Sequence, residues 1–152
     1  MQSTEKPQTP NPKHPEGELM NQPRLPWTSI SPKAYKAMAA VGATTADSAL
    51  GPGLMDLVQT RMHGESWQRI NSLSTWRETG LYSQRERAAL AWAETMTRLV
   101  DHHVGRDAEF DELKGQFSDQ EIVELCWTIA QINAWNRMAI SMLAPVADRP
   151  IE

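Results

Sequence analysis

Two Ser-x-x-Glu segments constrain this chain more than any other feature, because they mark where helices begin. Residues 83–86 read SQRE and residues 118–121 read SDQE. Each is a capping box, in which the serine hydroxyl and the glutamate carboxylate accept hydrogen bonds from each other's backbone N–H groups. Apolar residues follow both boxes at helical spacing, and the second run continues to about Leu143. Since that run is apolar nearly all round, it predicts a central helix packed on several sides or buried in a subunit interface.

Four further helices are expected. Ser31-Pro32 is an N-cap followed by proline at the first helical position, and Gly51-Pro52-Gly53 interrupts the helix that begins there. No strand-like alternation follows residue 30, so the sequence predicts an all-α fold of about six helices with a long central C-terminal helix. The apolar residues that mark the four helices are Tyr35, Met38, Ala39 and Val41; Leu54, Leu57, Val58 and Met62; Trp67, Ile70, Leu73 and Trp76, ending near Gly80; and Phe110, Leu113 and Phe117.

The distribution of proline divides the chain. Seven of the ten prolines lie between residues 7 and 32, and the first 24 residues are polar with little to bury. We therefore expect a proline-rich flexible arm over residues 1–24, a helical domain over 25–144 and a short tail over 145–152. A domain of this length can bury a core of its own.

Charge and motifs exclude several classes of function. The net charge of −4 and the isoelectric point near 5.6 argue against a nucleic-acid or anionic-membrane surface. The sequence has no apolar run long enough to cross a bilayer and no export signal at its start, so we expect no membrane partner and a cytoplasmic location. It also lacks a glycine-rich phosphate loop, an HExxH motif and paired cysteines, so no cofactor or metal is expected.

The histidines and the cysteine have plain interpretations. His102 and His103 are adjacent, so on a helix they point about 100° apart and cannot both bind one ion. A helix end that favours a protonated imidazole is the simpler account. Cys126 is the only cysteine, which excludes an internal disulfide. It shares a helix face with Ile122, Leu125 and Ile129, so we expect it to lie in the core and to be inert.

Asp56 and His63 are candidates for an acid and a base. They are seven positions apart, and on a continuous helix they would share one face at about 10 Å along the axis. They could flank a small cavity, or they could be a solvated acid and a histidine at a helix end. Asn133 and Asn136 raise a similar choice between a helix–helix hydrogen bond, which we favour, and the polar end of a pocket.

Three stretches together resemble a known family. They are residues 31–38 (SPKAYKAM), residues 75–92 (TWRETGLYSQRERAALAW) and residues 132–137 (INAWNR). They are similar to the AhpD-like (alkylhydroperoxidase) branch of the carboxymuconolactone decarboxylase family, over about residues 25–144. The resemblance implies an all-helical protomer that assembles into trimers or hexamers. It also implies a peroxidase that uses a Cys-x-x-Cys-x-x-x-His motif.

That motif is absent from this chain. Residues 54–58 (LMDLV) match the segment that opens the family's active-site helix, and the chain then passes through Arg61 directly to residues 62–66 (MHGES), which resemble the far side of the motif. By this resemblance Asp56 occupies the position of a proton-relay glutamate, and His63 is a candidate remnant of the motif histidine. The family's chemistry needs one thiolate to attack the peroxide and a second thiol to resolve the sulfenic acid. A single cysteine cannot perform both steps.

Three functions remain open from the sequence. We favour a homologue without the family's redox activity that acts as a helical oligomer, because six tryptophans and eight methionines exceed what a small core requires. The second is a cysteine-independent enzyme of the carboxymuconolactone decarboxylase type that uses Asp56 and His63. The third is a weak one-cysteine peroxidase that uses Cys126.

Overall fold

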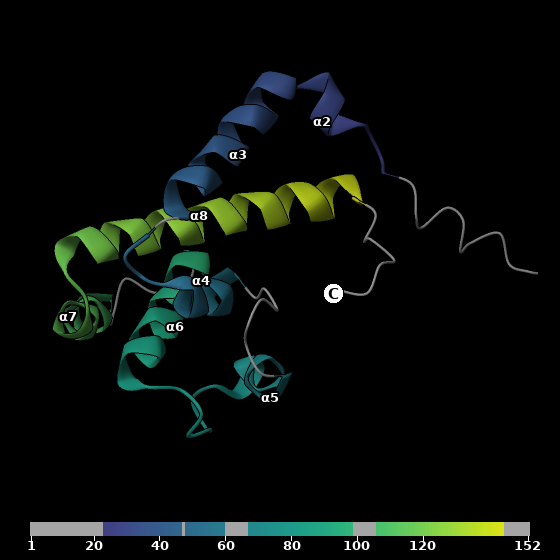
Figure 1. The fold of residues 1–152 in the computed structure, drawn as a ribbon. Coiled ribbons are helices and arrows are strands. Elements are labelled where there is room, and N and C mark those ends of the chain that lie inside the picture. Colours follow the sequence, from purple (N-terminus) through teal and green to yellow (C-terminus); the bar gives the residue numbers. More distant parts are fainter. Residues whose placement is uncertain (1–22, 47, 60–66, 99–105, 145–152) are drawn as a thin grey trace, which may run out of the picture.

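The structure, a computed structural model, describes residues 23–46, 48–59, 67–98 and 106–144. Over these ranges the chain is helical and contains no strand, so the prediction of an all-α fold is confirmed (Figure 1). Six of the α-helices are longer than one turn, and the last is the longest. The helices are α2 (Trp27–Ile30), α3 (Pro32–Ala46), α4 (Pro52–Gln59), α5 (Trp67–Asn71), α6 (Gln84–Thr97), α7 (Arg106–Gln116) and α8 (Asp119–Met142), with a 3-10 turn at Leu73–Thr75.

Both predicted capping boxes are present. The Ser83 hydroxyl accepts from the backbone N–H of Glu86, whose carboxylate accepts from the Ser83 N–H at 2.7 Å. Ser118 and Glu121 repeat this arrangement at the start of α8, where the Ser118 N–H donates to the carboxylate at 2.9 Å. Each box satisfies donors that a helix N-terminus otherwise leaves free. These local bonds explain why α6 and α8 begin where the sequence predicts.

The predicted third helix is wrong in its extent. It ends at Asn71 and not near Gly80, and a single 3-10 turn follows. The Ser72 N–H is shared between the carbonyls of Gln68 and Arg69, which tightens the chain into the 3-10 turn. Hydroxyl side chains at 72, 74 and 75 also compete for nearby backbone groups, as the bond from the Thr75 hydroxyl to the Ser72 carbonyl shows.

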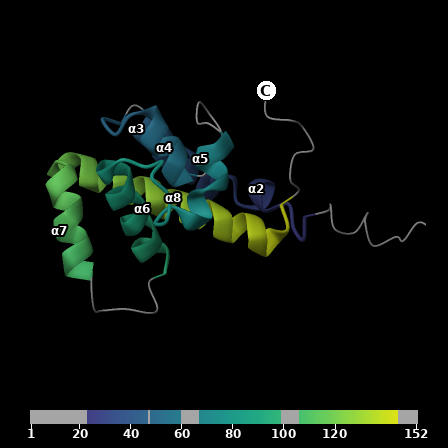
Figure 2. The same ribbon diagram turned by 90° about the horizontal axis from the view of Figure 1, so that it is seen from below.

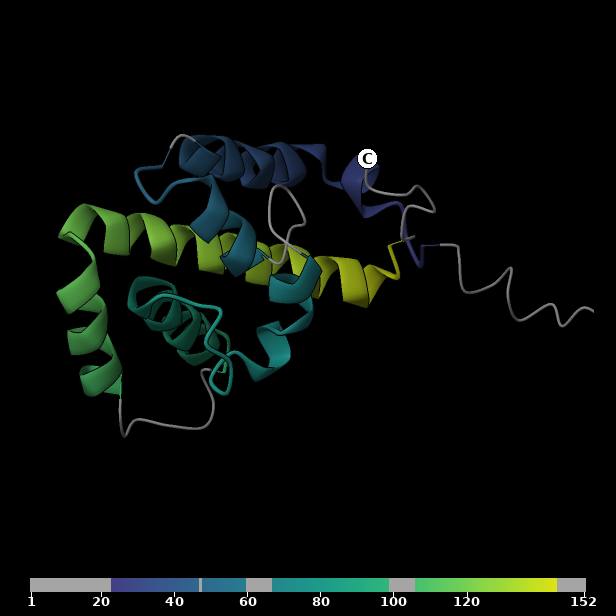
Figure 3. The same cartoon turned by 60° about the horizontal axis from the view of Figure 1, so that its bottom comes forward.

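The core lies where α4, α6 and α7 meet the first half of α8. Figure 2 shows α7 at one end of the molecule and α2 at the other, and Figure 3 shows α3 running alongside α8 with α4 beside them. A smaller cluster beneath α4 contains Leu57, Trp76, Tyr82 and Leu90. The buried residues of the main cluster are Leu50, Leu54, Met55, Ala88, Ala89, Leu113, Phe117, Ile122, Leu125 and Ile129.

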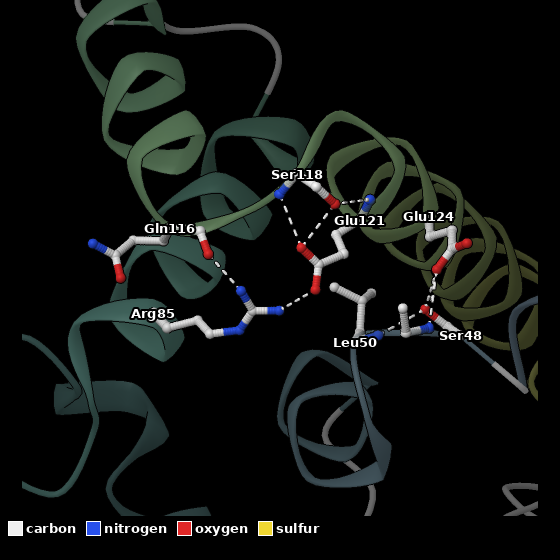
Figure 4. Close-up of polar contacts among 8 residues, drawn as sticks. Ser48, Leu50, Arg85, Gln116, Ser118, Glu121 and Glu124 are labelled. Atoms are coloured by element: carbon white, nitrogen blue, oxygen red, sulfur yellow. Dashed lines mark hydrogen bonds and ion pairs between the residues drawn. The ribbon is translucent and has the colours of Figure 1, made fainter.

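The side chain of Arg85 joins α6, α7 and α8 at the end of the molecule where α7 lies (Figure 4). Arg85 of α6 donates to the carbonyl of Gln116 at the end of α7 and to the Glu121 carboxylate of α8 at 2.6 Å. Its guanidinium also lies 3.9 Å from the centre of the Phe117 ring. The Ser118 backbone N–H, followed by Arg85, holds the pKa of Glu121 below its ordinary value. We refer to Arg85, Gln116, Phe117, Ser118 and Glu121 as the Arg85 junction.

The second half of α8 is packed less completely. All of the buried residues of α8 lie between Ile122 and Ile129, although the helix remains apolar to its end. Here α8 meets α2 and α3 through rings of Trp27, Tyr35 and Trp135, whose centres are 5.4–5.8 Å apart. Along the described side chains of α3, Thr45 is the only buried one. Helix α3 is therefore held on α8 through partly exposed contacts and not through a closed core.

Candidate functional site

A cavity of about 420 Å³ opens between α3, α4 and α8. This volume is within the range of small-molecule sites in proteins. The lining combines polar and apolar residues from the consecutive helices α3 and α4 and from α8, which lies much later in the chain. The lining residues are Ala39, Gly42 and Thr45 from α3; Pro52, Met55, Asp56 and Gln59 from α4; and Gln131 and Trp135 from α8.

Asp56 supplies the charge in this cavity. Its neighbours Met55 and Leu57 on α4 are buried in the core, whereas Asp56 is half-buried and lines the cavity. Within the described part of the chain, no hydrogen bond or ion pair reaches the Asp56 carboxylate. That Asp56 acts as a catalytic acid stays a prediction. His63 lies outside the described residues, so the pairing of Asp56 with His63 stays a prediction.

Gln131 of α8 forms a polar wall of the cavity together with residues of α3. Its Nε2 donates to the carbonyl of Met38 at 3.2 Å, so its side chain bridges α8 and α3. The amide lies directly over Gly42, where an added Cβ would be only 2.3 Å from Nε2. Glycine at position 42 therefore leaves the space that the Gln131 amide occupies. The Thr45 hydroxyl donates to the Gly42 carbonyl at 3.1 Å and completes this wall.

Trp135 separates the cavity from a second, apolar groove. The groove has a volume of about 320 Å³ and lies between α2, α3 and the end of α8. Trp135 lines both spaces, and its ring contacts Tyr35 and Trp27 on the groove side. Arg24 ties the segment before α2 to the end of α8, since its backbone N–H donates to the Met142 carbonyl and its guanidinium to the Ser141 carbonyl, both at 2.8 Å.

Cys126 lies on another side of α8. It packs against the main core and accepts a hydrogen bond from the indole N–H of Trp92 on α6, with 3.2 Å between Nε1 and Sγ. The predicted contact with the core is confirmed, but full burial is wrong because the residue is half-buried. The sulfur lies at the edge of the core, where Trp92 covers it. Cys126 and Gln131 are five positions apart, which places them about 140° apart around the helix.

The two asparagines of α8 have different surroundings. Asn133 donates from Nδ2 to the Thr97 hydroxyl of α6 at 2.9 Å, which confirms the predicted helix–helix hydrogen bond. Asn136 is exposed and lines neither the cavity nor the groove.

Sequence reasoning missed Gln131 as the polar residue of the pocket. It is a polar residue on an apolar helix one turn before Trp135, which is a weak signal that was present. The role of Gly42 could not be read from the sequence because it depends on a side chain 89 positions away.

The other candidate ligands gather at no common point. Among the described residues, no group of three His, Cys, Asp or Glu side chains could hold a metal ion. His14, His102 and His103 lie outside the described residues. Across the same ranges, no helix combines the length and apolar character needed to cross a bilayer.

Comparison with known proteins identifies the family. No protein-family profile matches the chain. The uncharacterized protein YdfG of Bacillus subtilis is 29% identical over 138 residues, an alignment that covers 78% of this chain and 93% of YdfG. A crystal structure from Agrobacterium tumefaciens superposes with a TM-score of 0.74 at 30% identity and covers 86% of this chain and 100% of that one. That protein is described as one of unknown function and as a candidate antioxidant defence protein, AhpD.

The fold and these similarities define an all-helical protein of the AhpD type. The chain belongs to the AhpD-like family, as the resemblance of its three sequence stretches implies. It departs from the family's dithiol motif because it has one cysteine.

Proposed function

We propose that this protein is an AhpD-like homologue that lacks dithiol peroxidase activity and acts as a helical homo-oligomer. The observation that carries the proposal is the single cysteine. Reduction of a hydroperoxide by the family's route leaves a sulfenic acid that a second thiol must resolve as a disulfide. No second thiol exists in this chain.

The position of Cys126 supports the same conclusion. Its sulfur is half-buried beneath Trp92, on the side of α8 that faces α6. The cavity lies on the side that faces α3 and α4, next to the segment that matches the opening of the family's active-site helix. A hydroperoxide bound in the cavity would therefore not meet the thiol.

Hydroperoxide reduction is the direct test. The purified protein and its Cys126→Ser variant are assayed with dithiothreitol and with a dihydrolipoyl system as the reductant. We expect no turnover in either protein. Turnover that disappears in Cys126→Ser would instead establish the one-cysteine peroxidase and overturn the proposal. Turnover that survives the substitution would overturn it in favour of a thiol-independent activity.

An exposed apolar stripe along α8 supports the proposal of an oligomer. Val123, Trp127 and Met138 are 55%, 58% and 38% exposed. Their spacings of four and eleven residues place them on one face of the helix. Large apolar patches on a helical surface are typical of protein–protein interfaces, in which tryptophan and methionine are enriched. A second copy of this chain is the partner that we propose.

Light scattering after size-exclusion chromatography tests the assembly. The unmodified chain is expected to form a trimer or a hexamer. Trp127→Gln combined with Val123→Gln should shift it to the monomer, since both changes remove apolar area from the stripe. Leu81→Gln is the matched control, because Leu81 is also exposed, at 46%, but lies in the loop before α6. A monomeric unmodified chain, or equal effects of both substitutions, would contradict the proposal.

The acid–base enzyme remains a second candidate because Asp56 lines the cavity without a partner among the described residues. Under this proposal Asp56 and His63 act on a lactone acid of the kind that carboxymuconolactone decarboxylases use. Release of carbon dioxide from such a substrate, lost in both Asp56→Asn and His63→Ala, would support it. Release that is unchanged in both variants would exclude these residues.

A further inference from the structure

The cavity between α3, α4 and α8 has the chemistry of a site for a cation. We propose that it binds a small organic ammonium ion with an apolar body, and that the Asp56 carboxylate is the counter-ion. The inference goes beyond the proposed redox-inactive oligomer and does not depend on it. It concerns the same cavity as the acid–base alternative, but it is tested by binding and not by turnover.

The charge of the cavity favours a cation. Asp56 is the single charged residue among the described residues of the lining, which include no lysine, arginine or histidine. The carboxylate has no ion-pair partner in the described part of the chain. A carboxylate that is partly removed from water attracts a cation more strongly than an exposed one and repels an anion.

The polar wall presents free acceptors beside the Asp56 carboxylate. Gln131 uses an N–H of Nε2 on the Met38 carbonyl, which fixes the orientation of the amide. Its Oε1 accepts no hydrogen bond from the described residues. The Thr45 hydroxyl donates to the Gly42 carbonyl and keeps its acceptor lone pairs. An ammonium group, which only donates, can use these acceptors together with the Asp56 carboxylate.

The apolar residues of the lining suit an apolar body. They are Ala39, Pro52 and Met55, together with Trp135, whose aromatic ring attracts cations. Gly42 maintains the arrangement, since any larger residue would displace the Gln131 amide. Charge, hydrogen-bonding groups and apolar surface thus point to the same class of ligand.

Isothermal titration calorimetry with benzylamine at pH 7 tests the inference. Benzylamine is protonated at this pH, while benzyl alcohol is a neutral analogue of the same size and benzoate is an anionic one. We expect saturable binding of benzylamine with a dissociation constant of order millimolar, as befits a ligand of this size. Benzyl alcohol and benzoate should bind at least about tenfold more weakly, since they lack the charge-assisted bond to Asp56.

Two substitutions locate the binding. Asp56→Asn keeps the shape of the side chain and should weaken benzylamine at least about tenfold. Asp111→Asn is the matched control, because Asp111 is an exposed aspartate on α7, and it should leave the affinity unchanged. Gln131→Leu, which removes the acceptor Oε1 at similar volume, gives a second and independent loss of affinity. Circular dichroism and thermal unfolding verify that each variant is folded.

Three results would each overturn the inference. The first is the absence of saturable binding at benzylamine concentrations on the order of 10 mM. The others are an equal affinity for benzylamine in the unmodified protein and in Asp56→Asn, or binding of benzyl alcohol or benzoate as tight as that of benzylamine. Peroxidase turnover would refute the redox-inactive proposal and leave this one intact. Failure of benzylamine to bind would refute this inference and leave the redox-inactive proposal intact.

Discussion

The two ends of the molecule share the apolar helix α8 but are packed very differently. Where α6, α7 and α8 meet, Leu113, Leu125 and Ile129 are at most 1% exposed, and the Arg85 junction ties the three helices together. Where α2 and α3 lie on α8, Ile140 is 75% exposed and a cavity and a groove separate the helices. The first end holds most of the buried side chains, and the second contains the cavity and the groove.

The difference shows that bonds at helix ends accompany close packing here. At the compact end, capping boxes and an arginine satisfy backbone groups at the ends of α6, α7 and α8, at the edge of the core. At the open end, the corresponding helix-terminal carbonyls of Ser141 and Met142 are met by Arg24, which is exposed. Local opening should therefore begin at the open end, where few apolar contacts hold α3 to α8.

Truncation of a core leucine should give the largest effect. Leu125→Ala removes a side chain with no exposed surface and should lower the free energy of unfolding by about 2–5 kcal/mol, since a cavity remains. Ile140→Ala, on the same helix but at the open end, should change it by about 0.5 kcal/mol or less. Urea titration of both variants measures the difference. Similar losses would show that the two halves of α8 are equally packed.

Two arginines give a comparison of intermediate size. Arg85→Ala removes bonds to Gln116 and Glu121 and the packing on Phe117, and we expect a loss of about 1–2 kcal/mol. Arg24→Ala removes only the guanidinium bond to the Ser141 carbonyl, which water can replace, and keeps the backbone bond to Met142, so its loss should be below about 0.5 kcal/mol. A greater loss for Arg24→Ala in thermal unfolding would reverse the comparison.

Acid should act on the compact end through Glu121. Because the Ser118 N–H and Arg85 lower its pKa in the folded state, the folded protein binds fewer protons than the unfolded chain as pH falls. The contribution of Glu121 to stability is therefore complete above the ordinary pKa of about 4.3 and is lost as pH falls through the lower folded value. Unfolding free energies from pH 7 to pH 3 should decrease less steeply in Glu121→Gln. If the free energy of unfolding fell equally steeply with pH in both proteins, the bonds from Ser118 and Arg85 to Glu121 would contribute nothing to stability.

Substitutions of two glycines in helices should give the smallest changes in the free energy of unfolding. A Cβ added to Gly115 on α7 would meet no atom within 4 Å, so Gly115→Ala should stabilise the protein by about 0.5–1 kcal/mol. Gly42→Ala should increase the stability of the protein by less, since its Cβ displaces the Gln131 amide and breaks the bond to Met38. Thermal unfolding of the two variants compares the gains. Equal gains would mean that Gln131 moves away without loss.

The helical architecture could be predicted well, and the candidate site only in part. The starts of α6 and α8 and the helix that follows Ser31 agree with the sequence, whereas α5 is shorter than predicted and the one-turn α2 was not expected. The sequence made Asp56 a candidate site residue but left open whether it borders a cavity, and it did not single out Gln131, Thr45 or Trp135 as lining residues. A residue becomes part of a pocket through what faces it, and the period of a helix does not contain that information.

Bonds that span three or four residues were determined by the sequence itself. Ser83 with Glu86 and Ser118 with Glu121 form within single turns, so their residue types alone specify them. The tertiary structure decided the contacts between distant residues, such as Gln131 with Met38 across 93 positions and Ser48 with Glu124 across 76. An apolar helix such as α8 can bury any of its faces, and only the helices packed against it decide which face becomes core and which becomes cavity or surface.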